Sequence, residues 1–186
     1  DERDAMVIAK TALGIPDALL PVVDREPEIR AARSLAAHRD FLTCENTRCK
    51  NRLRSILLES CPEFESLVDL SDASVLRLMA ELGGPWSVAA AGRRRAAALT
   101  RGASRGRVDA LVGSVGSSTK PDAAAIAAED RAVKFLARRI AENAAELKAA
   151  TIEISALLEQ DETYRCLLTI PGIGPKTASE LAISID

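Results

Sequence analysis

The sequence predicts an all-α protein with two long helices, short helices between them and a helix-hairpin-helix at its C-terminal end. Apolar side chains recur at heptad spacing over two long stretches, which is typical of helices that pack along a seam. Helix-favouring residues dominate the composition, and aromatic residues make up only 3% of it. No apolar run approaches the roughly 20 residues that a membrane span requires, so we expect no membrane partner.

Residues 1–24 are predicted to form a helix and a connector. Apolar side chains such as Ile8 repeat along one helical face up to Gly14, a residue suited to ending a helix. Two prolines follow before residue 25 and predict an irregular connector. Because the sequence opens within a helix and has no initiator methionine, we expect a fragment of a longer protein.

Residues 25–61 are predicted to form the first long helix, and residues 121–161 the second. At about 1.5 Å per residue the first helix would be on the order of 50 Å long. A small domain cannot enclose that length, so part of the helix should pack against another long helix. Apolar residues recur every seven positions in both helices, as Leu35, Leu42, Cys49 and Ile56 in the first and as Ile126, Val133, Ile140, Leu147 and Ile154 in the second.

The periodicity of the two long helices predicts a coiled coil but leaves its partners open. The helices can pair as an antiparallel hairpin within one chain or across a dimer. Asn143 lies near the seam of the second helix, where a polar side chain can fix the register of pairing.

Residues 62–120 are predicted to form short helices with an arginine-rich stretch. Asp72 is a candidate N-cap, and the sequence Gly83-Gly84-Pro85 predicts the end of the helix that Asp72 begins. The arginine-rich stretch contains no acidic residue, although the net charge of the whole chain is −2. We expect a mobile loop that contacts nucleic acid; the alternative is a solvated loop. Its arginines are Arg93, Arg94, Arg95, Arg101, Arg105 and Arg107, and a second basic patch on the first long helix contains Arg48, Lys50 and Arg52.

Residues 162–186 contain the most specific local pattern, a helix, a Pro-Gly-Ile-Gly turn and a second helix. Gly172 and Gly174 permit a tight turn and close approach of a ligand. The turn would present free backbone N–H groups at a positive helix end, which suits a DNA phosphate. Ile173, Lys176 and Thr177 complete the candidate DNA-binding set. The alternative is an ordinary glycine-rich turn between packed helices.

Asp1 and Asp4 are the candidate catalytic and metal-binding residues. Three positions apart on a helix, their carboxylates share one face and can bind a single Mg²⁺ or Mn²⁺. Two carboxylates alone are too few for a two-metal nuclease site. The four cysteines and one histidine do not have the spacing of a zinc site, and we expect free thiols in a reducing cytoplasm.

Three segments in the same order resemble the insertion-sequence one-ten family of transposases, which includes the Piv-type DNA invertases. Residues 1–9 look like that family's D-x-x-D-A-x-x-I-A helix, which closes its RuvC-like domain. Residues 51–57 are similar to the N-R-L-R-x-x-L segment at the start of its coiled coil. Residues 168–178 look like the opening of its C-terminal transposase domain.

The resemblance implies roles for these segments. Asp1 and Asp4 would be the last two carboxylates of a DEDD tetrad, sharing Mg²⁺ with an Asp and a Glu upstream. The family's serine nucleophile would lie beyond Asp186, so this chain alone should be inactive. Implied partners are DNA, a structured guide RNA and further copies of the chain, as a dimer or a tetramer of dimers.

Two other function classes stay open at this stage. The first is a non-catalytic coiled-coil module that clamps DNA with its helix-hairpin-helix. The second is a purely structural helical adaptor, which would show no salt-sensitive binding of nucleic acid.

Overall fold

The computed structural model describes residues 2–14, 27–100, 105–117 and 119–185, and every regular element within these ranges is helical. The all-α prediction is therefore confirmed. The predicted connector after Gly14 lies outside the described residues. None of the described helices combines the length and the apolarity that crossing a membrane requires. The helices are α1 (Glu2–Gly14), α2 (Pro27–Ser60), α3 (Pro62–Leu67), α4 (Ala73–Leu82), α5 (Pro85–Leu99), α6 (Arg105–Gly113), the 3₁₀ turn η2 (Ser114–Ser117), α7 (Ala123–Leu157), α8 (Glu162–Leu168) and α9 (Pro175–Ile185).

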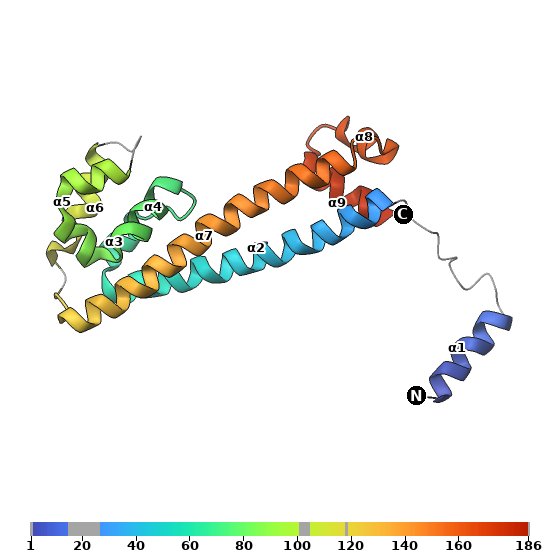
Figure 1. Ribbon diagram of the computed structural model, residues 1–186, viewed down its shortest axis with the longest axis horizontal. Helices are drawn as coiled ribbons and strands as arrows, with labels where there is room; N and C mark the ends of the chain where they lie inside the picture. The colour runs from blue at the N-terminus through green and yellow to red at the C-terminus, as the bar shows by residue number, and fades with distance from the viewer. Residues whose placement is uncertain (1, 15–26, 101–104, 118, 186) are drawn as a thin grey trace.

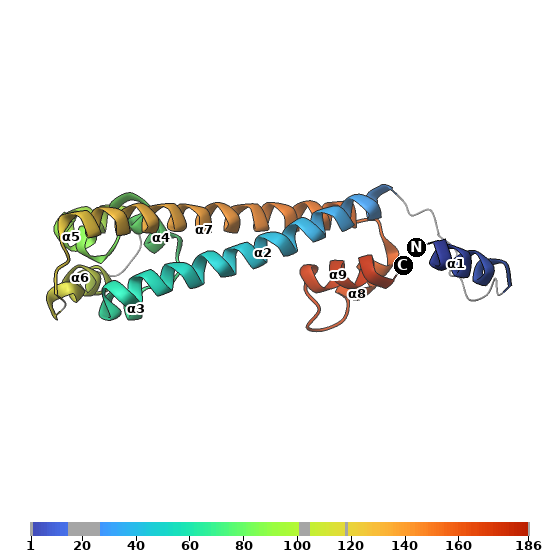
Figure 2. The same cartoon turned by 90° about the horizontal axis from the view of Figure 1, so that it is seen from below.

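The two long helices, α2 and α7, pack against each other in opposite directions (Figures 1 and 2). The long helices therefore pair within the chain. Asp122 is the N-cap of α7, because its side chain accepts a hydrogen bond from the backbone N–H of Ala125. The buried apolar side chains of the long helices include Leu42, Leu53 and Leu57 of α2 and Val133, Ile140 and Ile154 of α7.

The seam between α2 and α7 also buries polar side chains. Asn143 is 2% exposed and Asn46 is 8% exposed. The Oδ1 atom of Asn46 and the Nδ2 atom of Asn143 have no hydrogen-bond partner among the described residues. Buried amide atoms without partners lower stability, so these positions are not optimised for stability alone. A role for Asn143 in fixing the register stays a prediction.

The short helices α3 to α6 pack at one end of the long pair, where they form the larger hydrophobic core (Figure 1). Asp72 caps α4 as predicted, because its side chain accepts a hydrogen bond from the backbone N–H of Ser74 at 2.8 Å. The Nη1 atom of Arg107 lies 2.8 Å from Oδ2 of the same aspartate and ties α6 to α4. The core side chains of this region include Phe64, Leu78, Met79, Val88 and Leu111.

Two acidic residues of α7 bind the turn between α4 and α5 and the C-terminal end of α2. Asp130 accepts hydrogen bonds from the backbone N–H of Gly84 at 2.7 Å and from the hydroxyl of Ser87 at 2.5 Å. The neighbouring Glu129 accepts a hydrogen bond from Ser60 at the end of α2, at 2.8 Å. Asp130 and Glu129 form an acidic clamp, in which Asp130 fixes the α4–α5 turn to α7 and Glu129 fixes the end of α2 to it.

Glu129 makes the clamp sensitive to pH. Burial raises the pKa of its carboxyl group, the negative charges of Asp130 and Glu59 raise it further, and the hydrogen bond from Ser60 opposes this rise. A carboxyl pKa that is higher in the folded state favours the protonated form, so stability falls as pH rises from the unfolded-state pKa to the folded-state pKa. We expect the urea midpoint of Glu129→Gln minus that of the wild type to increase as pH rises from about 4.5 to neutral. A constant difference between the two proteins, like that of an exposed control such as Glu153→Gln, would contradict this.

The C-terminal helices α8 and α9 pack at the other end of the long pair (Figures 1 and 2). Arg39 of α2 is only 2% exposed, and its Nη2 atom lies 2.9 Å from Oε1 of Glu180 in α9. Arg33 donates a further hydrogen bond to the backbone carbonyl of Ile183. A second core joins these helices to the long pair through Ala32, Ile154, Leu158, Tyr164, Ala178 and Ala182.

Candidate nucleic-acid interface

The segment predicted to be a helix-hairpin-helix contains α8, α9 and the turn between them. Gly172 has φ of +91°, a backbone conformation that residues with a Cβ rarely adopt. The carbonyl of Gly174 accepts the hydrogen bond from the backbone N–H of Ala178 at 2.9 Å and so begins α9. Pro175 occupies the first position of α9, where its missing N–H costs nothing.

The N-terminal end of α9 is open to solvent. Gly172, Gly174, Lys176 and Thr177 are all exposed. Ile173 is half-buried and packs against the second core, so it anchors the turn. The ammonium of Lys176 lies 3.9 Å from a carboxylate oxygen of Glu180, a separation at which it stays available to another anion. The positive helix end and this lysine together favour an anion at the turn. Phosphate binding here stays a prediction.

The arginine-rich stretch lies on α5 and α6 wherever it is described, so the prediction of a mobile loop is wrong for these parts. Gly92, with φ of +75°, kinks α5 directly before the arginines. Arg107 is half-buried in its ion pair with Asp72, so it holds the fold together instead of facing a ligand. Arg101 and the side chain of Arg105 lie outside the described residues.

Three arginines of α5 are exposed, and two of them are unpaired among the described residues. Arg93 is paired with Asp109 of α6, with its Nε atom 3.2 Å from Oδ1. Arg94 and Arg95 are exposed and form no ion pair among the described residues. Arg93 and Arg94 also line a hollow of about 230 Å³ between α5 and α6. This part of the stretch therefore keeps free positive charge.

The second basic patch is spread around α2, as the alternation of its residues predicts. Arg48 is exposed and its Nη1 atom lies 3.1 Å from a carboxylate oxygen of Glu45. Lys50 is half-buried, and Arg52 is exposed. The three side chains do not form one surface because consecutive positions of a helix point in different directions.

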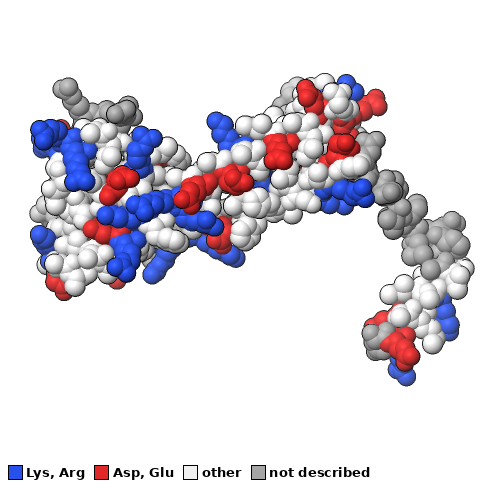
Figure 3. Space-filling view, in the orientation of Figure 1, with Lys and Arg blue, Asp and Glu red and all other residues white. Residues whose placement is uncertain are grey.

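A basic group on α7 was missed by the sequence analysis. Its cationic side chains surround Phe135, whose side chain is 65% exposed. The group lines a groove of about 620 Å³ between α7 and α2. Figure 3 shows that, on this face, Lys and Arg side chains gather over the end of the molecule that carries α4 to α6. Helical spacing is the signal that could have found the group, which consists of Arg131, Lys134, Arg138 and Arg139.

The candidate catalytic carboxylates lie at the N-terminal end. Asp4 is exposed on α1, and Asp1 lies outside the described residues. No group of three or more His, Cys, Asp and Glu side chains within the described ranges can hold a metal ion. The described side chains of α1 are all exposed, including those of Met6, Ile8 and Leu13. Figure 1 shows α1 apart from the long pair.

Comparison with known proteins finds similarity to one family of transposases. The profile of DEDD transposases of the IS110 type, described as a transposase, matches residues 1–62. A 43.6 kDa protein of insertion element IS110 from Streptomyces coelicolor is 28% identical over 191 residues, which cover 100% of this chain and 47% of the relative. The chain is similar to transposases of the IS110 family. The profile covers α1, α2 and the first residue of α3, where two of the three resembling segments lie.

A second IS110-type relative agrees with the first. A 44.8 kDa protein of insertion element IS116 from Streptomyces clavuligerus is 28% identical over 188 residues, covering 97% of this chain and 46% of the relative. The chain therefore spans about half the length of the curated relatives it matches. No solved structure matches it at a significant level.

Proposed function

We propose that this chain is the assembly and nucleic-acid docking part of a transposase that cuts and rejoins DNA. The match of residues 1–62 to the DEDD transposase profile carries this proposal, because it includes the Asp1 and Asp4 pair. The two relatives extend the similarity over α7 to α9. A non-catalytic DNA clamp would have no need of the acidic pair.

Asp1 and Asp4 are proposed to supply two of the four carboxylates that hold a divalent metal, with Mg²⁺ as the expected ion. Carboxylate oxygens are the ligands that Mg²⁺ prefers, and exposed Asp4 is accessible to it. The described residues do not form the metal site by themselves. The other two carboxylates and the serine nucleophile would belong to the part of such a transposase that this chain does not span, so we expect no strand exchange by this chain alone.

The exposed apolar side chains of α1 support this incomplete site. A helix that presents Met6, Ile8 and Leu13 to water is expected to be covered in the working protein. A RuvC-like domain would provide that cover and bring the missing carboxylates to the acidic pair.

Docking of DNA is proposed to use the hairpin turn and the free arginines of α5. Contacts from Lys176 and the backbone N–H groups of α9 would hold phosphates without reading sequence. Arg94 and Arg95 would add phosphate contacts at the opposite end of the long pair. A structured guide RNA offers the same phosphate chemistry and is the second proposed partner. The long pair would set the distance between the two docking points and support assembly of chains into a dimer or larger oligomer.

Binding to duplex DNA over a salt series tests the docking proposal. We expect the Arg94→Ala/Arg95→Ala variant to bind more weakly and to reduce the slope of log K against log salt concentration by about 1 per arginine. Gly172→Val should also weaken binding, because a side chain at φ of +91° distorts the turn. Fluorescence anisotropy with a labelled duplex measures both effects.

Lys148→Ala is the matched control, because Lys148 is an exposed cation of α7 outside the proposed docking surfaces. Its affinity should stay within about twofold of the wild type. If the wild-type chain shows no binding at about 50 mM salt, the docking role is wrong and the chain serves assembly alone.

A further inference from the structure

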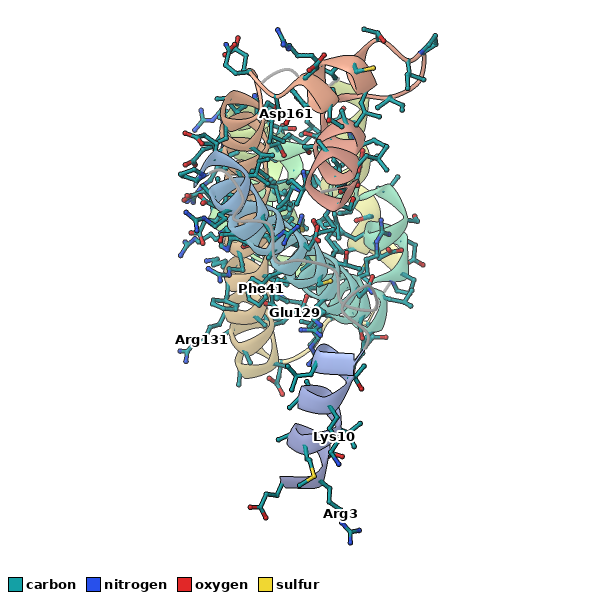
Figure 4. All side chains as sticks on the ribbon, turned by 90° about the vertical axis from the view of Figure 1, so that its right-hand side faces the viewer. Arg3, Lys10, Phe41, Glu129, Arg131 and Asp161 are labelled. Carbon is teal, nitrogen blue, oxygen red and sulfur yellow. The ribbon has the colours of Figure 1, made fainter. Side chains whose placement is uncertain are left out.

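The groove on α7 combines an exposed aromatic ring with cationic side chains. Four cationic side chains of α7 line this groove beside Phe135. Arg131 lies four positions before Phe135 and Lys134 one position before it. Arg138 lies three positions after Phe135 and Arg139 four positions after it. Residues three and four positions apart are neighbours on a helix surface, and Lys134 lines the same groove as Phe135. Figure 4 shows Arg131 projecting from α7 into solvent. The aromatic ring of Phe135 therefore lies among four cationic side chains.

The charge of the groove is largely uncompensated. Arg131 and Lys134 form no ion pair among the described residues. Arg138 donates only to a neutral group, the backbone carbonyl of Ala80 at 3.1 Å. Arg139 lies 3.8 Å from Glu142. The groove is lined by four cationic side chains and by two acidic ones, Glu45 and Glu142.

We infer that this groove binds an unpaired segment of nucleic acid, with a base stacked on Phe135 and the flanking phosphates on Arg131 and Lys134. Exposed aromatic rings beside cationic side chains are how proteins hold single strands, because every base has a π-face that can stack. A continuous duplex covers the faces of its bases, so the ring would contribute nothing to binding it. The volume of about 620 Å³ is in the range of sites that hold small ligands.

A second copy of the chain is a less suitable occupant of the groove. A two-fold contact centred on Phe135 would bring the cationic side chains of both copies together, and like charges at an interface oppose association. A single strand supplies the negative charge that the groove lacks. This inference rests on the proposed nucleic-acid function and adds a site for unpaired nucleotides that is separate from the hairpin turn.

The experiment compares a labelled single-stranded RNA or DNA with a duplex of the same length, using fluorescence anisotropy at fixed salt. Phe135→Ala should weaken single-strand binding about tenfold or more and change duplex binding less than about twofold. Phe135→Leu keeps apolar area without a π-face and should behave like Phe135→Ala. Phe135→Trp keeps a π-face and should bind the single strand about as tightly as the wild type. Lys134→Gln with Arg131→Gln should weaken single-strand binding and reduce its salt dependence.

Phe41 provides the matched aromatic control. It is 57% exposed on α2. The residues three and four positions from it on the helix, Ala37, His38, Cys44 and Glu45, include no Lys or Arg. Phe41→Ala should leave single-strand affinity unchanged. Unchanged binding by Phe135→Ala, or an equal loss in Phe41→Ala, would overturn the inference. So would a change in oligomeric state of Phe135→Ala in sedimentation, because it would make the groove a contact between copies. If the Arg94→Ala/Arg95→Ala and Gly172→Val variants bound duplex DNA as tightly as the wild type, that result would instead contradict the proposed docking role.

Discussion

Gly83→Ala is expected to lower the free energy of unfolding by about 3–5 kcal/mol. Gly83 has φ of +104° and ψ of −144°, a conformation that is essentially restricted to glycine. A Cβ at this position would lie 2.1 Å from Oδ1 of Asp130 and 2.9 Å from its Cβ. Rotation of the aspartate side chain cannot relieve the second contact. The substitution would therefore also break the hydrogen bond from the backbone N–H of Gly84 to Asp130.

Two other glycines separate the causes of this loss. Gly92, with φ of +75° and ψ of 166°, is also in a glycine-restricted conformation. Nothing lies within 4 Å of a Cβ built there, so Gly92→Ala should cost about 1–3 kcal/mol from backbone strain alone. Gly113 has neither a positive φ nor a close neighbour, and Gly113→Ala should be nearly neutral. Urea unfolding of the three variants measures the order. A cost for Gly83→Ala no larger than that for Gly92→Ala would show that Asp130 does not act as a clamp.

The Gly83 turn illustrates what the sequence predicts and what it leaves out. The Gly-Gly-Pro sequence predicts a helix end, and α4 ends there. The residue that makes the turn necessary is Asp130, which is 46 positions away from Gly84 in the chain. Local pattern carries information about breaks in helices, but not about which distant side chain fills the space that a glycine leaves.

The seam of the long pair shows the same limit. Heptad spacing predicts that Val133, Ile140 and Ile154 are buried, and they are. It does not predict the burial of Arg39, which is polar and outside the heptad. Arg39 is buried because α9 covers it, and α9 is 140 positions away. Pairing within the chain was equally out of reach, because hairpins and dimers of helices produce the same periodicity.

The candidate site was predicted unevenly for related reasons. Counting arginines identified the stretch on α5 but could not separate the free Arg94 from Arg107, whose charge is taken up by Asp72. The groove around Phe135 was missed because the apolar heptad of α7 was analysed and its opposite, exposed face was not. The roles of Asp1 and Asp4 came from the family resemblance, since two carboxylates on a helix carry no such information alone.

Glu180→Gln is expected to destabilise the protein by about 2–4 kcal/mol, more than any change to an exposed ion pair. Its carboxylate is the acidic partner of Arg39, whose guanidinium is 2% exposed and whose other contacts are weak. The Nη1 atom of Arg39 lies 3.5 Å from the hydroxyl of Ser179, and its Nε atom has no partner among the described residues. Removing the negative charge leaves a buried cation uncompensated. The expected cost is at the lower end for buried pairs because Glu180 itself is 45% exposed.

Substitution of Arg39, the other partner, separates the stabilisation by the ion pair from the destabilisation by an unpaired buried charge. Arg39→Met removes the buried cation, fills much of its volume and leaves Glu180 able to face water, so we expect a loss below about 1 kcal/mol. In the Arg39→Met background, Glu180→Gln should cost less than about 0.5 kcal/mol. Glu142→Gln, which breaks the exposed pair with Arg139, is the control and should be similarly small. Urea unfolding gives the free energies, and hydrogen exchange of the α9 amides shows whether the loss is local to the hairpin. Equal losses for Arg39→Met and Glu180→Gln would mean that the ion pair itself stabilises the docking of α9. A larger loss for Glu180→Gln, as expected, would mean that Glu180 is required mainly because Arg39 is buried, and that this requirement holds the hairpin against the long pair.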